Sequence, residues 1–355
     1  MLRNIARLRE RMQALGVTLR PHLKTCKSWD VAQLMLPTPA GPATVSSLKE
    51  AEVFAAHGVR DMIYAVGIAP QKLDRVAALR ARGVDLAVIL DSAEQAEALA
   101  ARSRALGRPL PALIEIDSDG HRAGVALGNH DLLRALARSL DSAGNLRGVL
   151  THAGASYGAR GAADLERYAD QERAAAVAAA QTLRAAGHAC PVVSVGSTPT
   201  AHFARALDGV TEVRAGVYVF FDLMMANLGV CSLDDIAISV LATVIGHQPA
   251  KGWTLTDSGW MALSRDPGDG AYAYGQVCDL ALNPIPDLLV TEMSQEHGVL
   301  RLREGSAAPA PRLELGARVR ILPNHACATA AQFDRYYVVD NSAQGTAAWP
   351  RFSGW

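Results

Sequence analysis

The clearest candidate for chemistry is a lysine in the segment Arg20-Pro21-His22-Leu23-Lys24-Thr25. Val17 and Leu19 belong to an apolar run that predicts a β-strand, and Pro21 ends its regular pairing because proline lacks a backbone donor. Lys24 would then follow the tip of a buried strand, where partial desolvation favours the neutral amine, a nucleophile and a base. A Schiff-base lysine needs such a place, although a surface lysine after a strand is the commoner alternative.

A second candidate, Gly196-Ser197-Thr198-Pro199-Thr200, is typical of a phosphate site. Glycine permits close approach of the backbone, the hydroxyls donate hydrogen bonds, and Pro199 suits the first turn of a helix, whose free N–H groups bind anions. Gly216-Val217 follows the next predicted strand. In barrels, phosphate sites favour the loops after strands seven and eight. An ordinary helix-capping turn is the alternative.

A third candidate is the pair His325 and Cys327. On an extended strand, residues i and i+2 face the same side, so an imidazole and a thiolate two positions apart can bind one metal ion. Thiolate with imidazole suits Zn²⁺, with Mg²⁺, Mn²⁺ and Co²⁺ as alternatives. Two protein ligands leave positions open for water and substrate, as catalytic metal sites require. By themselves two ligands are a weak motif, because a free cysteine is usually a core residue.

The elements that position these residues alternate between strand and helix up to about residue 216. The predicted strands span residues 17–23, 43–46, 62–65, 86–90, 112–116, 146–151, 192–195 and 211–215. Segments 92–105 and 164–186 are rich in good helix formers. Eight β/α units predict an α/β fold, a (β/α)8 TIM barrel. An open doubly wound sheet is the alternative, but no G-x-G-x-x-G follows any predicted strand.

The pattern changes after about residue 232. Six further strands, joined directly by turns, are predicted at residues 236–245, 253–256, 274–279, 288–292, 298–302 and 318–322. Without helix-length segments between them, these strands predict an antiparallel β domain. We therefore expect a barrel domain over residues 1–232 and a C-terminal β domain over residues 233–355 that carries the metal pair.

Composition excludes several classes of protein. Half of the residues are hydrophobic, yet no apolar run is long enough to span a bilayer, and the basic N-terminus is not followed by an apolar signal core. Basic and acidic residues balance, so the charge indicates neither a nucleic-acid nor a membrane partner. The five cysteines are scattered and show no C-x-x-C spacing, which predicts a reduced, cytoplasmic protein.

Several motifs together resemble one enzyme family. The Lys24 segment resembles the R-P-H-x-K-T motif of fold-type III pyridoxal 5′-phosphate (PLP) enzymes of the D-serine dehydratase and D-threonine aldolase family. Segments 196–200, 214–222, 257–266, 274–280, 295–298 and 321–329 resemble further motifs of that family in order. The resemblance implies an alanine-racemase-like PLP barrel followed by a β domain, and a homodimer. It also implies roles for single residues: Lys24 carries PLP, Thr198, Gly216 and Val217 hold its phosphate with Ser197 nearby, Tyr157 touches the cofactor, and Arg122 lies near its phenolic oxygen.

The sequence departs from the family pattern in a few places. Leu150 stands where relatives have an aromatic or polar contact, and Asp119 replaces the first glycine of a D-x-G-x-x-R-x-G loop. His297 lies in a turn that resembles the family's E-H-G turn, where we expect it near the metal or substrate, with a structural turn as the alternative. Relatives usually begin with a further strand that pairs into the β domain. We therefore expect either an upstream start or one strand fewer.

Within P-N-H-x-C-A-T, the pair His325 and Cys327 resembles dehydratases that act on D-3-hydroxy amino acids, whereas related aldolases more often carry H-x-D. The resemblance implies a PLP- and divalent-metal-dependent dehydratase that converts a D-amino acid of the D-serine or D-threo-3-hydroxyaspartate type to a 2-keto acid and ammonia. The alternatives are a D-threonine-type aldolase, which cleaves the Cα–Cβ bond, and a non-catalytic PLP-binding protein. The sequence disfavours the last, because such a protein needs no β domain with a metal pair.

Overall fold

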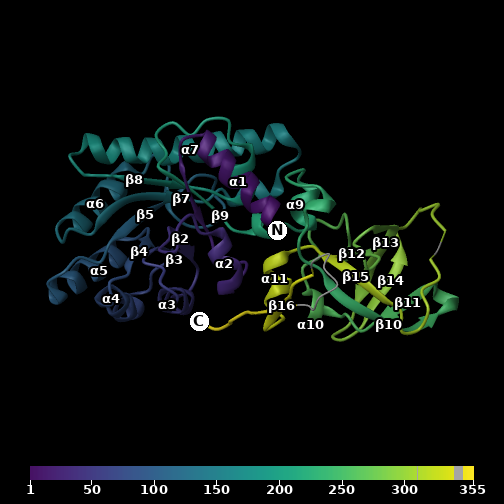
Figure 1. The fold of residues 1–355 in the computed structure, drawn as a ribbon. Helices are drawn as coiled ribbons and strands as arrows, with labels where there is room; N and C mark the ends of the chain where they lie inside the picture. The colour runs from purple at the N-terminus through teal and green to yellow at the C-terminus, as the bar shows by residue number, and fades with distance from the viewer. Residues whose placement is uncertain (310, 340–346) are drawn as a thin grey trace. The chain divides into compact units, whose positions relative to one another are not determined.

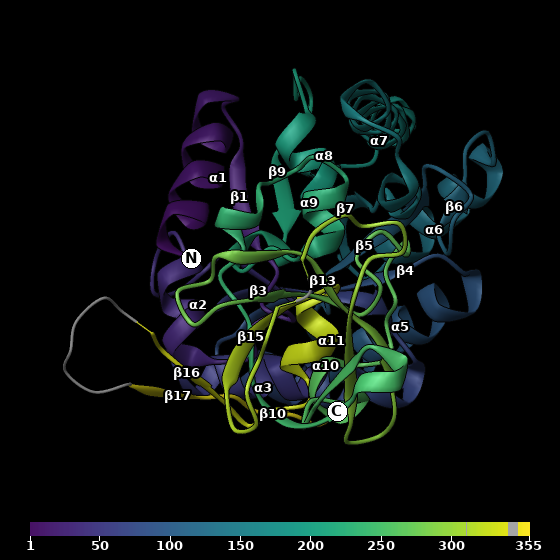
Figure 2. The same cartoon turned by 90° about the vertical axis from the view of Figure 1, so that its right-hand side faces the viewer.

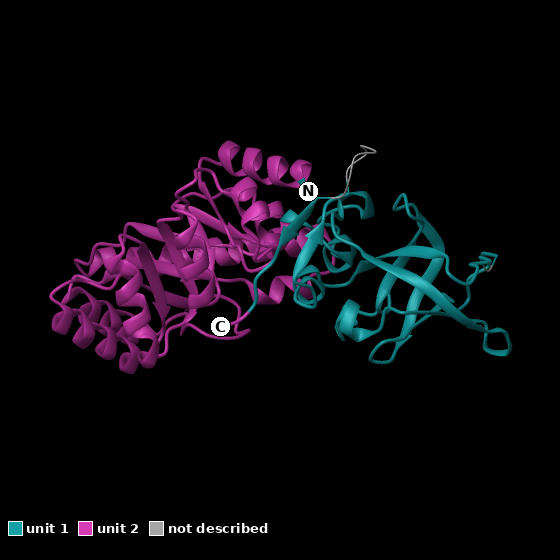
Figure 3. Ribbon diagram, turned by 60° about the horizontal axis from the view of Figure 1, so that its bottom comes forward, with its two compact units in different colours: residues 1, 219–353 teal, residues 2–218, 354–355 magenta. Residues whose placement is uncertain are grey.

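The computed structural model describes residues 1–309, 311–339 and 347–355. These residues form two compact units, one of residues 2–218 with 354–355 and one of residue 1 with 219–353 (Figure 3). The domain boundary between residues 232 and 233 stays a prediction. No helix within the described ranges has both the length and the hydropathy to cross a membrane.

The first unit has parallel strands at its centre and helices on the outside (Figure 1). Its strands are β1 (Thr18–Pro21), β2 (Ala43–Val45), β3 (Asp61–Gly67), β4 (Asp85–Leu90), β5 (Ala112–Asp117), β6 (Val125–Ala126), β7 (Leu146–Thr151), β8 (Val192–Val195) and β9 (Glu212–Ala215). Its helices are α1 (Leu2–Ala14), α2 (Trp29–Met35), α3 (Leu48–Ala56), α4 (Leu73–Ala81), α5 (Ala93–Leu106), α6 (His130–Asp141), α7 (Ala162–Ala185) and α8 (Thr198–Phe203).

Strand pairing confirms the predicted barrel. The order is β1-β9-β8-β7-β5-β4-β3-β2, and a parallel bridge between His22 and Thr44 joins β1 to β2. All eight predicted strands are present, with ends that differ by a few residues. The two-residue strand β6, which pairs with the end of β5, was not predicted. It is too short to carry a periodic pattern, and it exists only because the loop after β5 folds back.

Local sequence explains where the helices begin and end. α1 buries Ile5, Leu8 and Met12 at helical spacing, and it lies beside β1 (Figure 2). α5 begins at a capping box in which Ser92 and Gln95 exchange hydrogen bonds, and it ends at Gly107, whose φ of 63° suits glycine. Both predicted helices, 92–105 and 164–186, are confirmed as α5 and α7 to within two residues.

The barrel interior has an apolar side and an ionic side. Ile63, Ala87, Ile89, Leu113 and Leu150, from β3, β4, β5 and β7, form a buried cluster. Register pairs Leu150 with Ser194 and Ser194 with Glu212, so the same interior face continues into polar residues on β8 and β9. Burial of the aliphatic side chains stabilises the barrel through the hydrophobic effect. The buried polar side chains on the other side need hydrogen-bond partners.

The second unit contains a closed antiparallel barrel in the order β10-β11-β14-β13-β12-β15. Its strands are β10 (Val240–Gln248), β11 (Trp253–Thr256), β12 (Gly275–Cys278), β13 (Pro284–Met293), β14 (Gly298–Leu302) and β15 (Arg318–Pro323). A separate antiparallel pair consists of β16 (Arg335–Tyr337) and β17 (Ala348–Pro350). All six predicted strands are confirmed. Three short helices also occur, α9 (Leu223–Asn227), α10 (Trp260–Leu263) and α11 (Ala326–Ala330).

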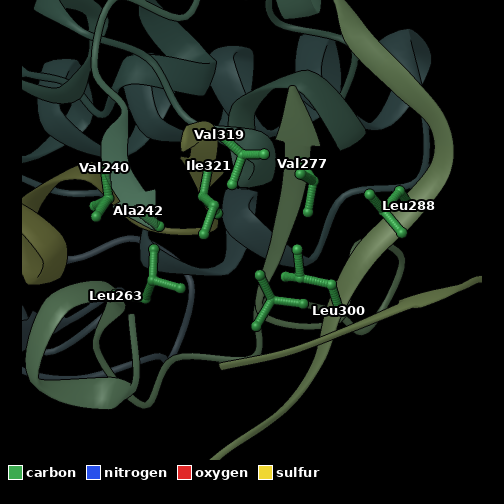
Figure 4. Packing of buried hydrophobic residues seen from close by; sticks show 9 residues of the cluster. Val240, Ala242, Leu263, Val277, Leu288, Leu300, Val319 and Ile321 are labelled. Carbon is green, nitrogen blue, oxygen red and sulfur yellow. The ribbon is translucent and has the colours of Figure 1, made fainter. Parts of the chain in front are cut away.

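Figure 4 shows the core of this second barrel, in which Val240, Val277, Leu300 and Ile321 point toward one another from different strands. Ile321 is fully buried and lies on β15, which pairs with both β10 and β12. Alternate residues of each strand face inward, as the period of two in a half-buried strand requires. The barrel therefore depends on this single layer of aliphatic side chains.

We predict that Ile321→Ala lowers the free energy of unfolding of this unit by about 3 kcal/mol, because it removes buried methyl groups and leaves a cavity. Leu315→Ala is the control, since Leu315 is 72% exposed and its loss should cost less than about 0.5 kcal/mol. Urea unfolding is followed by tryptophan fluorescence, to which this unit contributes three of the five tryptophans, Trp253, Trp260 and Trp349. Equal midpoints for the two variants would contradict the assigned core.

Candidate active site

The Lys24 loop leaves the end of β1 through backbone hydrogen bonds to its neighbouring strands. His22 N donates to Ala215 O at 2.7 Å, and Leu23 N donates to Thr44 O at 2.9 Å. The side chain of Lys24 is exposed, so the partial burial that we expected of its amine is wrong for this structure. The strand ends at Pro21, and in the turn that follows Leu23 and Thr25 are fully buried while Lys24 between them is exposed.

Positive charges converge on two imidazoles beside this loop. Burial, followed by the charges of Lys24 and Arg214, holds the pKa of His22 well below its usual range. Burial lowers the pKa of His152 to about 3, with Arg122, Lys24 and Arg214 acting in the same direction and a hydrogen bond to Gly196 O opposing them. Both imidazoles are therefore neutral near pH 7. Three cations around one end of the barrel suit an anionic group.

The neutral imidazoles hold neighbouring loops. His22 Nε2 lies 2.8 Å from Ser46 Oγ, in the loop after β2. His152 Nδ1 donates to Gly196 O at 2.9 Å, which links the loop after β7 to the loop after β8. In our sequence analysis neither histidine was assigned a role. Their positions after strand ends were the available signal.

The predicted phosphate loop is built as expected around Ser197. Ser197 caps α8 by accepting a hydrogen bond from Thr200 N, and Pro199 lies in the first turn. The Oγ1 atom of Thr198 is buried and finds no hydrogen-bond partner among the described residues. A buried hydroxyl of this kind requires a partner from a ligand or water. The site thus fits a phosphate that accepts a hydrogen bond from Thr198.

The loop after β9 approaches the Lys24 loop closely. A side chain at Gly216 would place its Cβ 3.0 Å from His22 O and 3.1 Å from Thr25 Oγ1, so a larger residue would push the two loops apart. Val217, the next residue, is buried. The structure thus brings Gly216 and Val217 to the loop of Lys24, as the phosphate prediction requires.

Tyr157 and Arg122 lie on the same end of the barrel. The Tyr157 ring centroid is 6.3 Å from that of His152, and Arg122 Nη2 is 3.9 Å from Glu115 Oε1 with more than half of its side chain exposed. Both side chains are thus reachable by a ligand. Leu150, by contrast, lies inside the barrel and is 1% exposed, so it takes no part in the site.

Asp119 has a structural role where the family pattern has glycine. Its Oδ1 accepts a hydrogen bond from His121 N at 3.1 Å, and its Oδ2 accepts one from Ala155 N at 2.9 Å. Asp119 therefore ties the loop of Arg122 to the loop of Tyr157. A glycine could not make this connection.

A buried glutamate that the sequence analysis missed holds the Lys24 loop. Glu50 on α3 is fully buried; its Oε1 lies 3.2 Å from Lys27 Nζ, and its Oε2 accepts a hydrogen bond from Ser46 N at 2.9 Å. Lys27 has a φ of 42°, an uncommon conformation for a residue other than glycine. The ion pair with Glu50 stabilises this conformation three residues after Lys24.

His325 and Cys327 lie together in the second unit, although the geometric reason that we gave is wrong. They do not share an extended strand: His325 is the extended residue that precedes α11, and Cys327 lies in the helix. Their side chains are nevertheless hydrogen bonded, and this bond, opposed by burial and assisted by Asp222 and Asp266, raises the pKa of His325 to about 9. A helix start can bring positions i and i+2 together as a strand does.

Two aspartates organise this pair. Asp266 Oδ2 lies 3.0 Å from His325 Nδ1, and the buried Asp222 accepts a hydrogen bond from Ala326 N at 2.9 Å. A carboxylate on one imidazole nitrogen fixes the ring orientation and leaves the other nitrogen for a metal, an arrangement typical of metal-ligating histidines. Imidazole, thiolate and supporting carboxylate fit a divalent ion.

His297 is exposed, and its carbonyl accepts a hydrogen bond from Ser294 N at 2.8 Å within its turn. Within the described part of the chain, no group of three or more His, Cys, Asp and Glu side chains is arranged to hold a metal ion. His297 therefore does not join His325 and Cys327 as a third ligand in this structure.

Comparison with known proteins covers both units. The family model described as "Alanine racemase, N-terminal domain" matches residues 1–223, and "Putative serine dehydratase domain" matches residues 237–339. D-threo-3-hydroxyaspartate dehydratase of Delftia sp. (strain HT23) is 54% identical over 364 residues, which cover 100% of this chain and 95% of that protein. D-threonine aldolase of Arthrobacter sp. is 30% identical over 331 residues, 91% of this chain and 82% of that protein.

A solved structure of a D-threo-3-hydroxyaspartate dehydratase, described as a cysteine-to-alanine mutant in the metal-free form, superposes with a TM-score of 0.95. It is 52% identical and covers 100% of this chain and 95% of that chain.

We predict that Glu50→Ala lowers the free energy of unfolding by about 3 kcal/mol, because it leaves the Lys27 ammonium and the Ser46 amide without their buried acceptor. Glu52→Ala on the same helix is the control. Glu52 pairs with Arg75 near the surface, so its loss should cost less than about 1 kcal/mol. Thermal and urea unfolding measure both, and similar losses for the two variants would refute the role of Glu50.

Proposed function

We infer the function from family membership: the chain belongs to the fold-type III PLP enzymes of the D-serine dehydratase and D-threonine aldolase family, and it is a PLP-dependent lyase. We propose that it is a dehydratase that converts a D-3-hydroxy amino acid of the D-threo-3-hydroxyaspartate or D-serine type to a 2-keto acid and ammonia. The observation that carries this proposal is the pairing of His325 with Cys327 and Asp266, in a chain 54% identical to a dehydratase.

Residues of the first unit would hold PLP. Lys24 would carry it, the Thr198 hydroxyl would donate to its phosphate together with Ser197, Gly216 and Val217, and Tyr157 and Arg122 would contact its ring. When bound, PLP supplies an electron sink for charge that develops at the substrate Cα. Lys24, once released, would take the Cα proton, and the neutral His22 and His152 would keep the surrounding loops in place.

His325 and Cys327 would hold a divalent ion. Zn²⁺ fits best because thiolate and imidazole are its common ligands, with Mg²⁺, Mn²⁺ and Co²⁺ as alternatives. Such an ion supplies Lewis-acid chemistry at the 3-hydroxyl, which eases its departure. Asp266 would keep the imidazole in the orientation that binding needs.

The second candidate is a D-threonine-type aldolase, which the 30% identity to a D-threonine aldolase supports. An aldolase would release glycine and an aldehyde, whereas a dehydratase releases ammonia and a keto acid. A PLP-binding protein without activity is less well supported, because the ordered His325–Cys327–Asp266 group would then have no use.

The setting of the enzyme is part of the proposal. None of its five cysteines, all of which lie in the described part of the chain, forms a disulfide, which fits a reducing compartment such as the cytoplasm. We also propose a homodimer, as expected for the family.

We predict that borohydride treatment of the purified protein fixes the cofactor covalently to Lys24. A Lys24→Ala protein should lose turnover and the absorption band near the border of the visible and ultraviolet, since it lacks the amine that would carry the cofactor. Peptide mapping by mass spectrometry locates the modified residue, and Lys27→Arg is a control that keeps the positive charge beside Glu50. Labelling of another lysine would overturn the assignment.

We predict that chelation, or His325→Ala, abolishes turnover and leaves the cofactor spectrum unchanged, because the ion would act on the substrate hydroxyl. Added Zn²⁺ or Mn²⁺ should restore the chelated enzyme and not the variant. Ammonia, keto acid, glycine and aldehyde are measured with D-serine, D-threonine and the 3-hydroxyaspartate stereoisomers. Glycine formed from D-threonine faster than ammonia from any substrate would favour the aldolase, and full activity after exhaustive chelation would remove the metal from the reaction.

A further inference from the structure

A single buried carboxylate on α7 joins two loops of the site in the first unit. Glu172 is 2% exposed. Its Oε1 accepts hydrogen bonds from Ala153 N and Gly196 N, both at 2.9 Å, and its Oε2 accepts one from the Thr200 hydroxyl at 2.8 Å. We propose that Glu172 is a positioning residue, which fixes the loop after β7 against the loop after β8 and so shapes the phosphate site before the cofactor binds.

The three contacts fall beside the residues that would touch PLP. Ala153 directly follows His152 and precedes Tyr157 by four positions, while Gly196 and Thr200 enclose Ser197 and Thr198. Ionised, Glu172 accepts without donating, so it fixes the direction of every hydrogen bond that it makes. Hydrogen bonds to a charged acceptor are also stronger than neutral ones. One side chain thus controls the position of both loops.

Glu172 also sets the direction of the hydrogen bonds among the hydroxyl groups near it. The Thr200 hydroxyl proton is directed to Glu172, which leaves Thr200 Oγ1 free to accept from Ser197 N at 3.1 Å. Ser197 Oγ lies 3.0 Å from Ser156 Oγ, and Ser156 in turn donates to Ala153 O at 2.7 Å. This series of hydrogen bonds therefore ends at Ala153, whose backbone N–H donates to Glu172. It leaves the Thr198 hydroxyl as the buried group of the loop without a described partner.

The environment of Glu172 is compatible with a charged carboxylate. The net pKa of Glu172 is raised, because burial outweighs the hydrogen bonds from Gly196, Thr200 and Ala153 and the charge of Arg214, all of which lower it; the geometry, with three donors and no acceptor at the carboxylate, is what suits the charged form. Three donors occupy three of the roughly four lone-pair positions that a carboxylate offers. Glutamine would match the shape but would point an amide N–H₂ at the Thr200 hydroxyl when its oxygen faces the two backbone amides. The Thr200 hydroxyl would then accept from residue 172 where it now donates, so its proton would have to turn away.

This inference depends on the proposed PLP function, and the experiment separates the two. Glu172→Gln is compared with the wild type and with Glu166→Gln, a control on the same helix whose carboxylate pairs with Arg205 at the surface. PLP is removed from each holoenzyme, and the Kd of the apoprotein for added PLP is measured by fluorescence quenching. The ³¹P NMR shift of the bound phosphate and the melting temperature of the apoprotein are recorded on the same samples.

We expect the Kd for PLP to rise about 10-fold to 100-fold in Glu172→Gln, with a displaced ³¹P resonance, because a charged hydrogen-bond acceptor is lost. Glu166→Gln should match the wild type in all three measurements. An unchanged Kd and ³¹P shift in folded Glu172→Gln would overturn the role of Glu172. Failure of the wild-type apoprotein to bind PLP would instead overturn the proposed function.

A second pair of variants covers the case in which Glu172→Gln does not fold. Thr200→Val removes one arm of the network and leaves both backbone hydrogen bonds of Glu172 in place, whereas Thr200→Ser keeps the hydroxyl. We expect Thr200→Val to weaken PLP binding about tenfold and Thr200→Ser to retain the wild-type affinity, since the hydroxyl links the Glu172 carboxylate directly to the Ser197 amide. Equal PLP affinity in Thr200→Val and the wild type would contradict the proposal.

Discussion

The buried guanidinium of Arg214 needs hydrogen-bond and charge partners inside the barrel. The strands that lead into the loops of the site supply these partners near their ends. Arg214 is 4% exposed, and burial lowers its pKa to about 10, so it remains charged. It donates hydrogen bonds to Ser194 Oγ at 2.7 Å and to Thr151 O at 2.6 Å. The Ser194 hydroxyl in turn donates to the Glu212 carboxylate, which forms an ion pair with Arg20. A buried charge without such partners would cost several kcal/mol. The network therefore fixes β1, β7, β8 and β9 relative to one another, and these strands lead into the loops of Lys24, His152, Gly196 and Gly216.

The backbone N–H groups of the loops impose a second requirement. They lie beyond the strands and need hydrogen-bond acceptors from elsewhere in the protein. Carboxylates that lie in a helix or directly before one accept from these amides. Glu50 accepts from Ser46 N and Glu172 accepts from Gly196 N, while Asp222 accepts from Ala326 N in the other unit. An ionised carboxylate suits this use, since it accepts several hydrogen bonds and requires no proton donor of its own in return. Such a loop is ordered by protein groups alone, which lowers the entropy that a bound cofactor must offset.

The sequence predicted the barrel well because β-branched runs and alanine-rich segments alternate with the periods of strand and helix. It predicted the loops of the site from residue types after strand ends and from family motifs. It did not reveal Glu172, although the spacing of α7 contained a signal. Glu172 lies on the same buried face of α7 as Leu165, Ala169 and Ala176, so a charged residue stands among apolar ones. The sequence also could not predict the local path of the backbone after a strand. That Lys24 is exposed and that Cys327 lies in a helix depend on how the chain turns after a strand, and tertiary contacts decide this.

Two carboxylate arrangements with different purposes follow from these contacts. Glu172 and Glu50 bind backbone amides, and so they fix where a loop lies. Asp266 binds an imidazole nitrogen at 3.0 Å, and so it fixes how a side chain turns and which nitrogen faces outward. Because a hydrogen bond to Nδ1 leaves Nε2 as the ligating atom, Asp266 determines the donor that His325 presents to a metal, while Asp222 holds the start of α11, from which Cys327 projects. The metal site that we propose would thus depend on carboxylates that orient its ligands, and the proposed phosphate site on carboxylates that hold its loops.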